Sequence, residues 1–362
     1  MKVDSVHELL QRGVGAGVAP AAVAEWGRVG GEPRNEVVGS ARQVPVRQPA
    51  SDRTWFDLAS LTKPLVTTTL AMIAFRKGEL ALETTVGEML SECRGASVGD
   101  LNVRQLLTHT SGLPAWLPLY CLAEGDPGRL EERLGSVRLV EAPGSRVVYS
   151  CVGFVILGMI LERTFGSDLS SVFRHEVTGK LGIDDELGFC PDSVTHSLSG
   201  GAAFPVAESR LLHQLGFDRR WIPPTAPGLP DDGNARFLGG AAGNAGLFGT
   251  AVGVFGLAKE YLGGTLFDRE EIEIATTLRT EGFEQARGLG WQIASSPGCS
   301  AGSSLSPRAF GHTGFTGVSV WIDPEIEGVF VLLTNRNHPG QRENDLHPFR
   351  RRFHTIARES LT

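Results

Sequence analysis

The chain has too few cysteines, too widely spaced, for a disulfide framework or a zinc site. Its 362 residues include five cysteines, an odd number, and no two of them form a C-x-x-C pair. Their positions are Cys93, Cys121, Cys151, Cys190 and Cys299. Disulfide-stabilised domains and structural zinc sites use paired cysteines at characteristic spacings. The sequence therefore predicts neither a disulfide framework nor a metal site.

Long apolar runs are also missing. The longest, VGFVILGMIL at 152–161, is much shorter than the roughly 20 residues that a transmembrane helix needs. The N-terminal MKVDSVHELLQRGVG is amphipathic and lacks the apolar centre of a signal peptide. We therefore expect a cytoplasmic protein with no membrane partner, in which 152–161 forms a buried helix.

The chain lacks an excess of positive charge. Its formal net charge is -7 at pH 7, and its basic residues form no stripe. The densest basic run, 350–352, lies in a helical pattern and is typical of a solvated helix face. Since nucleic-acid-binding proteins present a positive patch to phosphate, the sequence predicts no nucleic acid partner. It leaves the oligomeric state open.

What the chain does have is an ordinary globular composition, 41% hydrophobic and 21% charged, with strand patterns at both ends. The predicted strands are 20–29, 35–42, 288–295, 318–324 and 328–335, and the predicted terminal helices are 4–13 and 342–359. Residues 79–245 read as helices and loops punctuated by proline and glycine. We therefore expect a sheet-containing α/β subdomain from 1–78 and 246–362, with 79–245 forming a mostly helical subdomain beside it.

Three short motifs resemble catalytic or phosphate-binding signatures but lack an essential part. GCSAG (298–302) matches the G-x-S-x-G nucleophile elbow, yet SSLSPRA follows where a helix is required, so Ser300 is a poor nucleophile candidate. HEVTG (175–179) lacks the second histidine of a zinc-protease helix. GGAAGNAG (239–246) lacks the lysine and hydroxyl of a phosphate loop and is interpreted as a turn into the next helix.

The stretch DLASLTKPLV (57–66) contains a more promising pair. The chain has only five lysines against 29 arginines, and Lys63 lies three residues after Ser60. Pro64 is tolerated only in the first turn of a helix, so Ser60 lies at or just before the helix N-terminus. There the ammonium can reach the hydroxyl, and exposed backbone N–H groups can stabilise an oxyanion. Lys63 is a base only if its pKa is lowered, so a second base would strengthen the site.

Two later segments offer further groups. PGSRVVYSCVGFVILGMILE (143–162) places Tyr149 just before the predicted buried helix, and AFGHTGFTGVSVWIDP (309–324) places His312 at the head of a strand. Taken alone, a core tyrosine and an ordinary polar histidine are the simpler interpretations. Their order after Ser60 and Lys63 carries more information than either residue.

The combination of Ser-x-x-Lys, a tyrosine about ninety residues later and His-Thr-Gly near the C-terminus resembles the serine β-lactamase and penicillin-recognising superfamily. Two more segments match in order, LLTHTSGLP (106–114) and AGLFGTAVGVFGLAK (245–259). The chain is most similar to the class C β-lactamase-like serine hydrolases, which include family VIII carboxylesterases, D-aminopeptidases and D,D-peptidases. The resemblance extends over nearly the whole chain.

This resemblance implies a fold and a mechanism. The fold is a five-stranded antiparallel sheet with the terminal helices on one face and an all-α subdomain, with the site between them. Ser60 would be acylated, and Lys63 and Tyr149 would share the role of general base. The backbone N–H groups of Ser60 and Phe315 would form the oxyanion hole. No metal or cofactor is implied.

The resemblance also assigns the substrate-binding positions, and two of them depart from the family. His312, Thr313 and Gly314 would form the strand that flanks the substrate, and Cys151 stands where relatives often have asparagine or aspartate. A thiol replaces the polar group that orients Lys63 and a substrate amide. The histidine replaces a lysine whose permanent charge grips a substrate carboxylate. We therefore expect a site that favours neutral substrates.

The function expected from the sequence is hydrolysis of small-molecule esters or amides through a Ser60 acyl-enzyme. A β-lactamase or D,D-peptidase is the nearest alternative, although the missing export signal counts against both. A different class of protein, a ligand-binding homologue with weakened catalysis, is disfavoured because Ser60, Lys63 and Tyr149 are all present.

Overall fold

The computed structural model describes residues 5–192, 196–201, 206–217, 221–225, 228–339 and 344–362. Its strands are β1 (Ala21–Arg28), β2 (Arg34–Arg42), β3 (Gln48–Pro49), β4 (Thr54–Asp57), β5 (Leu187–Phe189), β6 (Ser197–Leu198), β7 (Leu247–Gly249), β8 (Gln292–Ile293), β9 (Phe310–Thr313), β10 (Ser319–Asp323) and β11 (Gly328–Thr334). Its α-helices are α1 (Val6–Gly15), α2 (Thr69–Lys77), α3 (Val86–Met89), α4 (Val103–Leu107), α5 (Leu119–Leu122), α6 (Leu130–Leu134), α7 (Cys151–Phe165), α8 (Leu169–Phe173), α9 (Gly179–Leu181), α10 (Val206–Leu215), α11 (Gly233–Phe237), α12 (Ala251–Ala258), α13 (Arg269–Thr276) and α14 (His347–Glu359).

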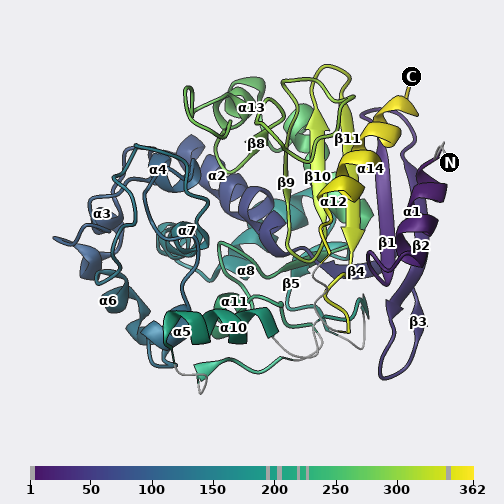
Figure 1. Cartoon of the computed structure of the whole chain (residues 1–362). Coiled ribbons are helices and arrows are strands. Elements are labelled where there is room, and N and C mark those ends of the chain that lie inside the picture. Colours follow the sequence, from purple (N-terminus) through teal and green to yellow (C-terminus); the bar gives the residue numbers. More distant parts are fainter. Residues whose placement is uncertain (1–4, 193–195, 202–205, 218–220, 226–227, 340–343) are drawn as a thin grey trace.

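The main sheet joins the two ends of the chain. Its strand order is β3-β2-β1-β11-β10-β9-β8, and β1 pairs antiparallel with both β2 and β11. The yellow C-terminal strands therefore lie beside the purple N-terminal ones in Figure 1. A smaller sheet of order β5-β7-β4-β6 holds the strand that leads to Ser60. The mixed α/β class predicted from the sequence is confirmed.

The number of strands in the main sheet differs from the prediction. We predicted five strands, and the sheet has seven, because β3 and the HTG strand β9 are separate members. The predicted strand 288–295 shortens to β8. Gly290 has a φ of 72°, which is a left-handed conformation incompatible with an extended strand, so the chain turns there.

The two faces of the sheet bury different layers. On β1, Ala22, Ala24 and Trp26 face one way and pack with apolar residues of α1 and α14. The intervening Val23 faces the opposite core, which contains α2, α7 and α12. This alternation is the period-two pattern of a strand buried on both faces. As expected, both terminal helices cover the same face of the sheet (Figure 1).

Helix α7 forms the centre of the helical part of the molecule. It packs against α2, α3, α4 and α8, and the apolar run 152–161 is almost completely buried in it, as predicted. Among the described residues, none of the helices is both long and apolar enough to cross a membrane.

The helix that begins after β4 is not a regular α-helix throughout. A single 3-10 turn (Ala59–Leu61) leads into a π-helical stretch (Lys63–Thr68), and only then into α2. Pro64 lies in the first turn, as its missing N–H requires. The helix ends at Gly78, whose φ of 70° is typical of a left-handed C-cap. Wide π-turns often occur at functional sites.

Candidate active site

Ser60 lies on a sharp turn between β4 and the helix. The preceding Ala59 has a φ of 46°, an uncommon conformation for a residue with a side chain. The Asp57 carboxylate holds this turn by accepting a hydrogen bond of 2.8 Å from the Ala59 N–H. Ser60 stays partly exposed although both its neighbours are buried. The turn therefore presents the Ser60 hydroxyl outward from a fixed backbone.

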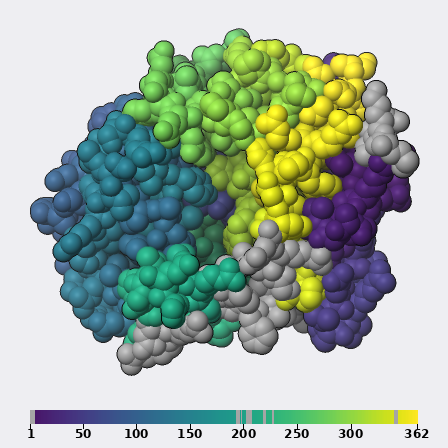
Figure 2. Space-filling model, viewed as in Figure 1, coloured from purple at the N-terminus to yellow at the C-terminus, as the bar shows by residue number. Residues whose placement is uncertain are grey.

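Figure 2 shows the surface hollowed between the helical part in blue and teal and the sheet part in green and yellow. Lys63 is completely buried beneath Ser60. Its Nζ donates to Ser60 Oγ at 3.1 Å, to the Asn244 carbonyl at 2.9 Å and to Cys151 Sγ at 3.4 Å. Three segments far apart in the sequence therefore meet at one ammonium group.

The pKa of Lys63 is raised, so the side chain stays an ammonium at neutral pH. Burial alone lowers the pKa of this lysine, but its electrostatic interactions with Cys151 and Tyr149 raise that pKa and outweigh burial. Lys63 Nζ lies 5.1 Å from the centroid of the Tyr149 ring. The lysine is thus placed to stabilise negative charge on its neighbours.

The segment 106–114 supports the tyrosine. His109, which has a φ of 59°, accepts a hydrogen bond on its carbonyl from Val148 N and another on Nδ1 from Ser150 N, at 2.8 and 3.0 Å. Its ring lies 4.6 Å from that of Tyr149. Burial and nearby cations lower the pKa of His109 far below its usual value, so the ring is a neutral support. Ser150 Oγ also donates to Pro114 O. The LLTHTSGLP stretch therefore fixes the backbone on both sides of Tyr149.

Arg287 is a functional candidate that the sequence gave no reason to select. Its guanidinium carbon lies 5.6 Å from the Tyr149 ring centroid, and the side chain is only 6% exposed. Within the described part of the chain it has no carboxylate partner, and its side-chain acceptor is Gln285 Oε1 at 2.7 Å. Burial lowers the pKa of Arg287 to about 10, so it still carries its charge at neutral pH.

His312 is uncharged, as the sequence suggested, but the site is not without a permanent cation. Burial, followed by Arg287 and Lys63, lowers the pKa of His312 far below its ordinary value. Its Nδ1 is 2.8 Å from Thr313 O, and its ring lies 5.8 Å from that of Tyr149. Arg287 therefore places a permanent cation near Tyr149, whereas His312 is neutral. The preference for neutral substrates stays a prediction.

The turn after β9 packs directly against the Ser60 turn. A Cβ added to Gly314 would lie 2.8 Å from the Leu58 carbonyl, so only glycine fits at this approach. The next residue, Phe315, is 39% exposed. Thr316 Oγ1 donates to the Asp57 carbonyl at 2.8 Å. Residues 313–316 are therefore fixed beside Ser60, where Thr313 is partly exposed.

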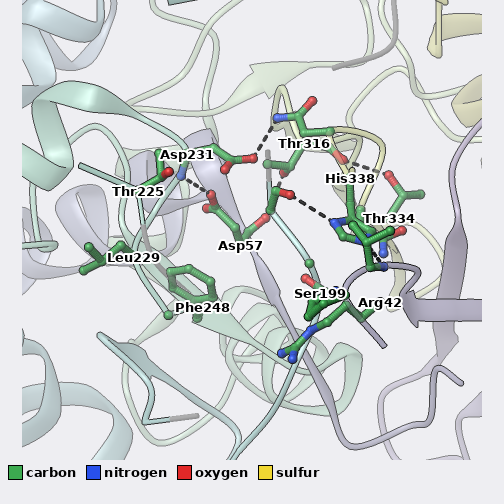
Figure 3. Close-up of a pocket in the computed structure, with 17 residues that line it drawn as sticks. Arg42, Asp57, Ser199, Thr225, Leu229, Asp231, Phe248, Thr316, Thr334 and His338 are labelled. Carbon is green, nitrogen blue, oxygen red and sulfur yellow. Dashed lines mark hydrogen bonds between the residues drawn. The ribbon is translucent and has the colours of Figure 1, made fainter. Parts of the chain in front are cut away.

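A cavity of about 280 Å³ lies beside the end of β4, and Asp57 lines it. Figure 3 shows its carboxylate pointing toward Asp231, whose N–H donates to it at 2.7 Å. Asp231 in turn accepts from Asn337 Nδ2 at 2.9 Å. Burial and the Asp231 charge raise the pKa of Asp57 to about 7. Because these groups bond to one another, we interpret this wall as support for the Ser60 turn.

Comparison with known proteins identifies the family of the chain. The Beta-lactamase family model matches residues 8–354. The chain belongs to the beta-lactamase family. It is 27% identical over 319 residues to a "Putative D-alanyl-D-alanine carboxypeptidase" of Escherichia coli O157:H7, covering 80% of this chain and 70% of that protein.

Solved structures of other proteins share the fold. "EstCE1, a hydrolase with promiscuous acyltransferase activity" superposes with a TM-score of 0.73 at 22% identity, covering 97% of both chains. A class C beta-lactamase gives a TM-score of 0.73 at 20% identity, covering 98% of this chain and 94% of that one. The family match supports a serine hydrolase at a coarse level, and the solved structures show the fold. Neither comparison fixes the reaction.

The three incomplete motifs have structural roles in this family member. Ser300 is buried, and its Oγ accepts a hydrogen bond from Trp321 Nε1 at 3.0 Å. Glu176 of the HEVTG stretch pairs with Lys77 and Lys180 at 2.6 and 2.7 Å. The 239–246 stretch forms a turn before β7 and α12, as predicted, but its Asn244 also reaches Lys63. The sequence does not predict that contact, because it depends on how the turn packs against the Ser60 helix.

Proposed function

We propose that the protein is a serine hydrolase that forms an acyl-enzyme on Ser60 and acts on small esters or amides. The observation that carries this proposal is the 3.1 Å hydrogen bond from the buried Lys63 ammonium to the partly exposed Ser60 hydroxyl. The Ser60 hydroxyl is bonded to Lys63, whose ammonium lies close to Tyr149, and the turn with the exposed Phe315 is beside it. This arrangement suits acyl transfer better than ligand binding.

The raised pKa of Lys63 divides the roles of the two candidate bases. Tyr149 acts as a phenolate, whose charge the Lys63 ammonium stabilises. It takes the proton of Ser60 as Oγ forms its bond to the substrate carbonyl carbon, and the electron pair of the C=O bond moves onto the carbonyl oxygen. The backbone N–H groups of Ser60 and Phe315 donate to the oxyanion. Tyr149 then returns the proton to the leaving group as its bond to the carbon breaks. In the second half-reaction Tyr149 takes a proton from water as the water oxygen bonds to the acyl carbon. It returns that proton to Ser60 Oγ as the ester bond breaks.

Covalent labelling tests the proposal. A fluorophosphonate probe should attach to the wild-type protein, and mass spectrometry should place the adduct on Ser60. Ser60→Ala should abolish labelling and hydrolysis of nitrophenyl butyrate, whereas the matched control Ser300→Ala should retain both. A protein that binds esters without turnover or labelling would instead be a ligand-binding homologue, and an adduct on Ser300 would refute the assignment.

One observation favours a second candidate function, cleavage of substrates that carry a carboxylate. A buried guanidinium without a carboxylate partner is unfavourable unless something compensates it, and a substrate carboxylate would do so. The E. coli relative is named a putative D-alanyl-D-alanine carboxypeptidase, and class C beta-lactamases share the fold. Rates on a D-alanyl-D-alanine peptide, a chromogenic cephalosporin and nitrophenyl butyrate would rank the two candidates.

A further inference from the structure

The turn that carries Asn244 is bonded to the helix of the nucleophile. Ala242 and Ala245 pair across Gly243 and Asn244, with the Ala242 N–H donating to Ala245 O at 3.1 Å. Thr67 Oγ1 donates to the Gly243 carbonyl at 2.6 Å. Together with the bond from Lys63 to the Asn244 carbonyl, this places the turn against the face of the helix that bears Ser60 and Lys63.

Two glycines allow the same turn to pack closely against α7. A Cβ on Gly243 would lie 2.0 Å from the Phe154 carbonyl, and one on Gly158 would lie 2.7 Å from Gly243 N. Such a close approach of two backbones requires glycine on both sides. The consequence is that Asn244 reaches the first turn of α7, where Cys151 lies.

The carboxamide of Asn244 is buried without a partner. The residue is 1% exposed, and within the described part of the chain neither Oδ1 nor Nδ2 makes a hydrogen bond. A buried, unpaired amide is costly and uncommon in folded proteins. The Cys151 thiol interacts with this carboxamide without reaching hydrogen-bond geometry. Burial raises the pKa of the thiol, and Lys63 and Asn244 oppose that rise. The thiol is a weak partner for hydrogen bonds.

We propose that Asn244 is the positioning residue for Lys63, and that its carboxamide supplies from this turn the polar group that relatives carry at position 151. The inference rests on the proposed function, since it concerns the lysine of the Ser60 acyl-enzyme. In the free protein Lys63 already donates to Ser60 Oγ. Once that oxygen carries an acyl group it becomes a poorer acceptor, and the free Asn244 Oδ1 takes the released N–H. This keeps the ammonium next to the reacting ester.

Kinetics of turn and helix variants test the proposal. Asn244→Ala should lower kcat for nitrophenyl butyrate about tenfold or more, the effect of losing a hydrogen bond to a charged group, with KM little changed. Cys151→Asn introduced into Asn244→Ala should restore most of that loss, because it returns a carboxamide to Lys63. Cys151→Ser in the same background is the matched control and should restore much less.

The pH profile gives a readout that a purely structural role would not change. An acceptor favours the charged form of Lys63, so Asn244→Ala should move the alkaline limb of kcat to lower pH, and Asn244→Asp should move it to higher pH. Asn335→Ala is the control for structural damage. Asn335 is buried with its amide fully bonded, so its loss should lower Tm and leave the pH profile unchanged.

Two results would overturn the inference. One is wild-type kcat in Asn244→Ala, and the other is a loss that Cys151→Asn does not restore in a protein of normal Tm. If Ser60→Ala abolishes activity while either result is obtained, the proposed function stands and only the role of Asn244 fails. If Ser60→Ala leaves activity intact, the proposed function itself fails.

Discussion

At the scale of single residues, Tyr149 is the group whose surroundings are most telling. Its ring is near two cations, Lys63 and Arg287, and two histidines held neutral by burial. Hydrophobic packing alone does not explain why Lys63 and Arg287 both lie next to the Tyr149 ring.

Replacement of Tyr149 by phenylalanine separates chemistry from packing. Tyr149→Phe keeps the ring contacts and removes the proton acceptor, so acylation should slow by about a hundredfold or more, as for other general bases. Stopped-flow release of nitrophenol measures this step, and Tm should change little. Tyr120→Phe is the control, because it loses its bond to Glu208 in a separate cluster and should cost stability but not activity. If Tyr149→Phe leaves the rate of acylation unaltered, Tyr149 is a packing residue and not the general base.

The sequence was informative about residues whose chemistry depends on spacing. Ser60 and Lys63 could be selected because a helix brings positions i and i+3 together, and their contact is present. Arg287 and Asn244 could not be selected in the same way. Within the described residues the Arg287 guanidinium has no carboxylate partner and the Asn244 carboxamide has no hydrogen bond. Only the folded structure reveals such a missing partner.

At the scale of elements, the contact between α7 and the 242–245 turn determines how accurately Lys63 is held. Two backbones approach there with glycine on each side, and no side chain separates them. The sequence predicted both elements, but glycine patterns alone do not specify which segment packs against which. The shortened strand β8 shows the same limitation, because Gly290 interrupts an otherwise extended pattern.

A methyl group at this contact should damage both stability and activity. Gly243→Ala forces a carbon to within 2.0 Å of the Phe154 carbonyl, and overpacking of this kind typically costs about 1–3 kcal/mol of unfolding free energy. Displacement of the turn should also lower kcat. Gly256→Ala on α12 is the matched control, since its Cβ would meet only Ile183 at an ordinary 3.7 Å. Equal free energies of unfolding for the two variants in urea would contradict the close approach of the Gly243 and Phe154 backbones.

At the scale of the whole molecule, buried histidines make the fold sensitive to acid. His354 of α14 is fully buried, with Nε2 3.0 Å from Ser319 Oγ. Burial, followed by Arg350, lowers the pKa of His354 from 6.5 to about 3. Between these pH values His354 binds a proton in the unfolded chain but not in the folded one. The free energy of unfolding must therefore fall as pH drops from 6.5 toward 3.

Measurement of that slope tests the buried state of His354. His354→Gln should be less stable than wild type at pH 7.5, but its unfolding free energy should fall less on acidification, by about one proton in the linkage relation. Denaturant titrations at a series of pH values give the comparison, with the exposed His213→Gln as control. Parallel pH dependences for His354→Gln and wild type would show that His354 takes up its proton without unfolding.

The pairing of β1 with β11 has a consequence for the order in which the protein is made. A ribosome releases β1 long before β11, yet each strand is the other's neighbour in the finished sheet. Until β11 emerges, β1 can pair only with β2 in the sheet. The helices α12 and α14, which cover the apolar side chains on its two faces, are also made later in the chain than β1. The helical middle of the chain can pack during synthesis. The sheet that positions the turn after β9 beside Ser60 closes only after β11 has been synthesised. Messages truncated before β11 should therefore yield chains without a formed site.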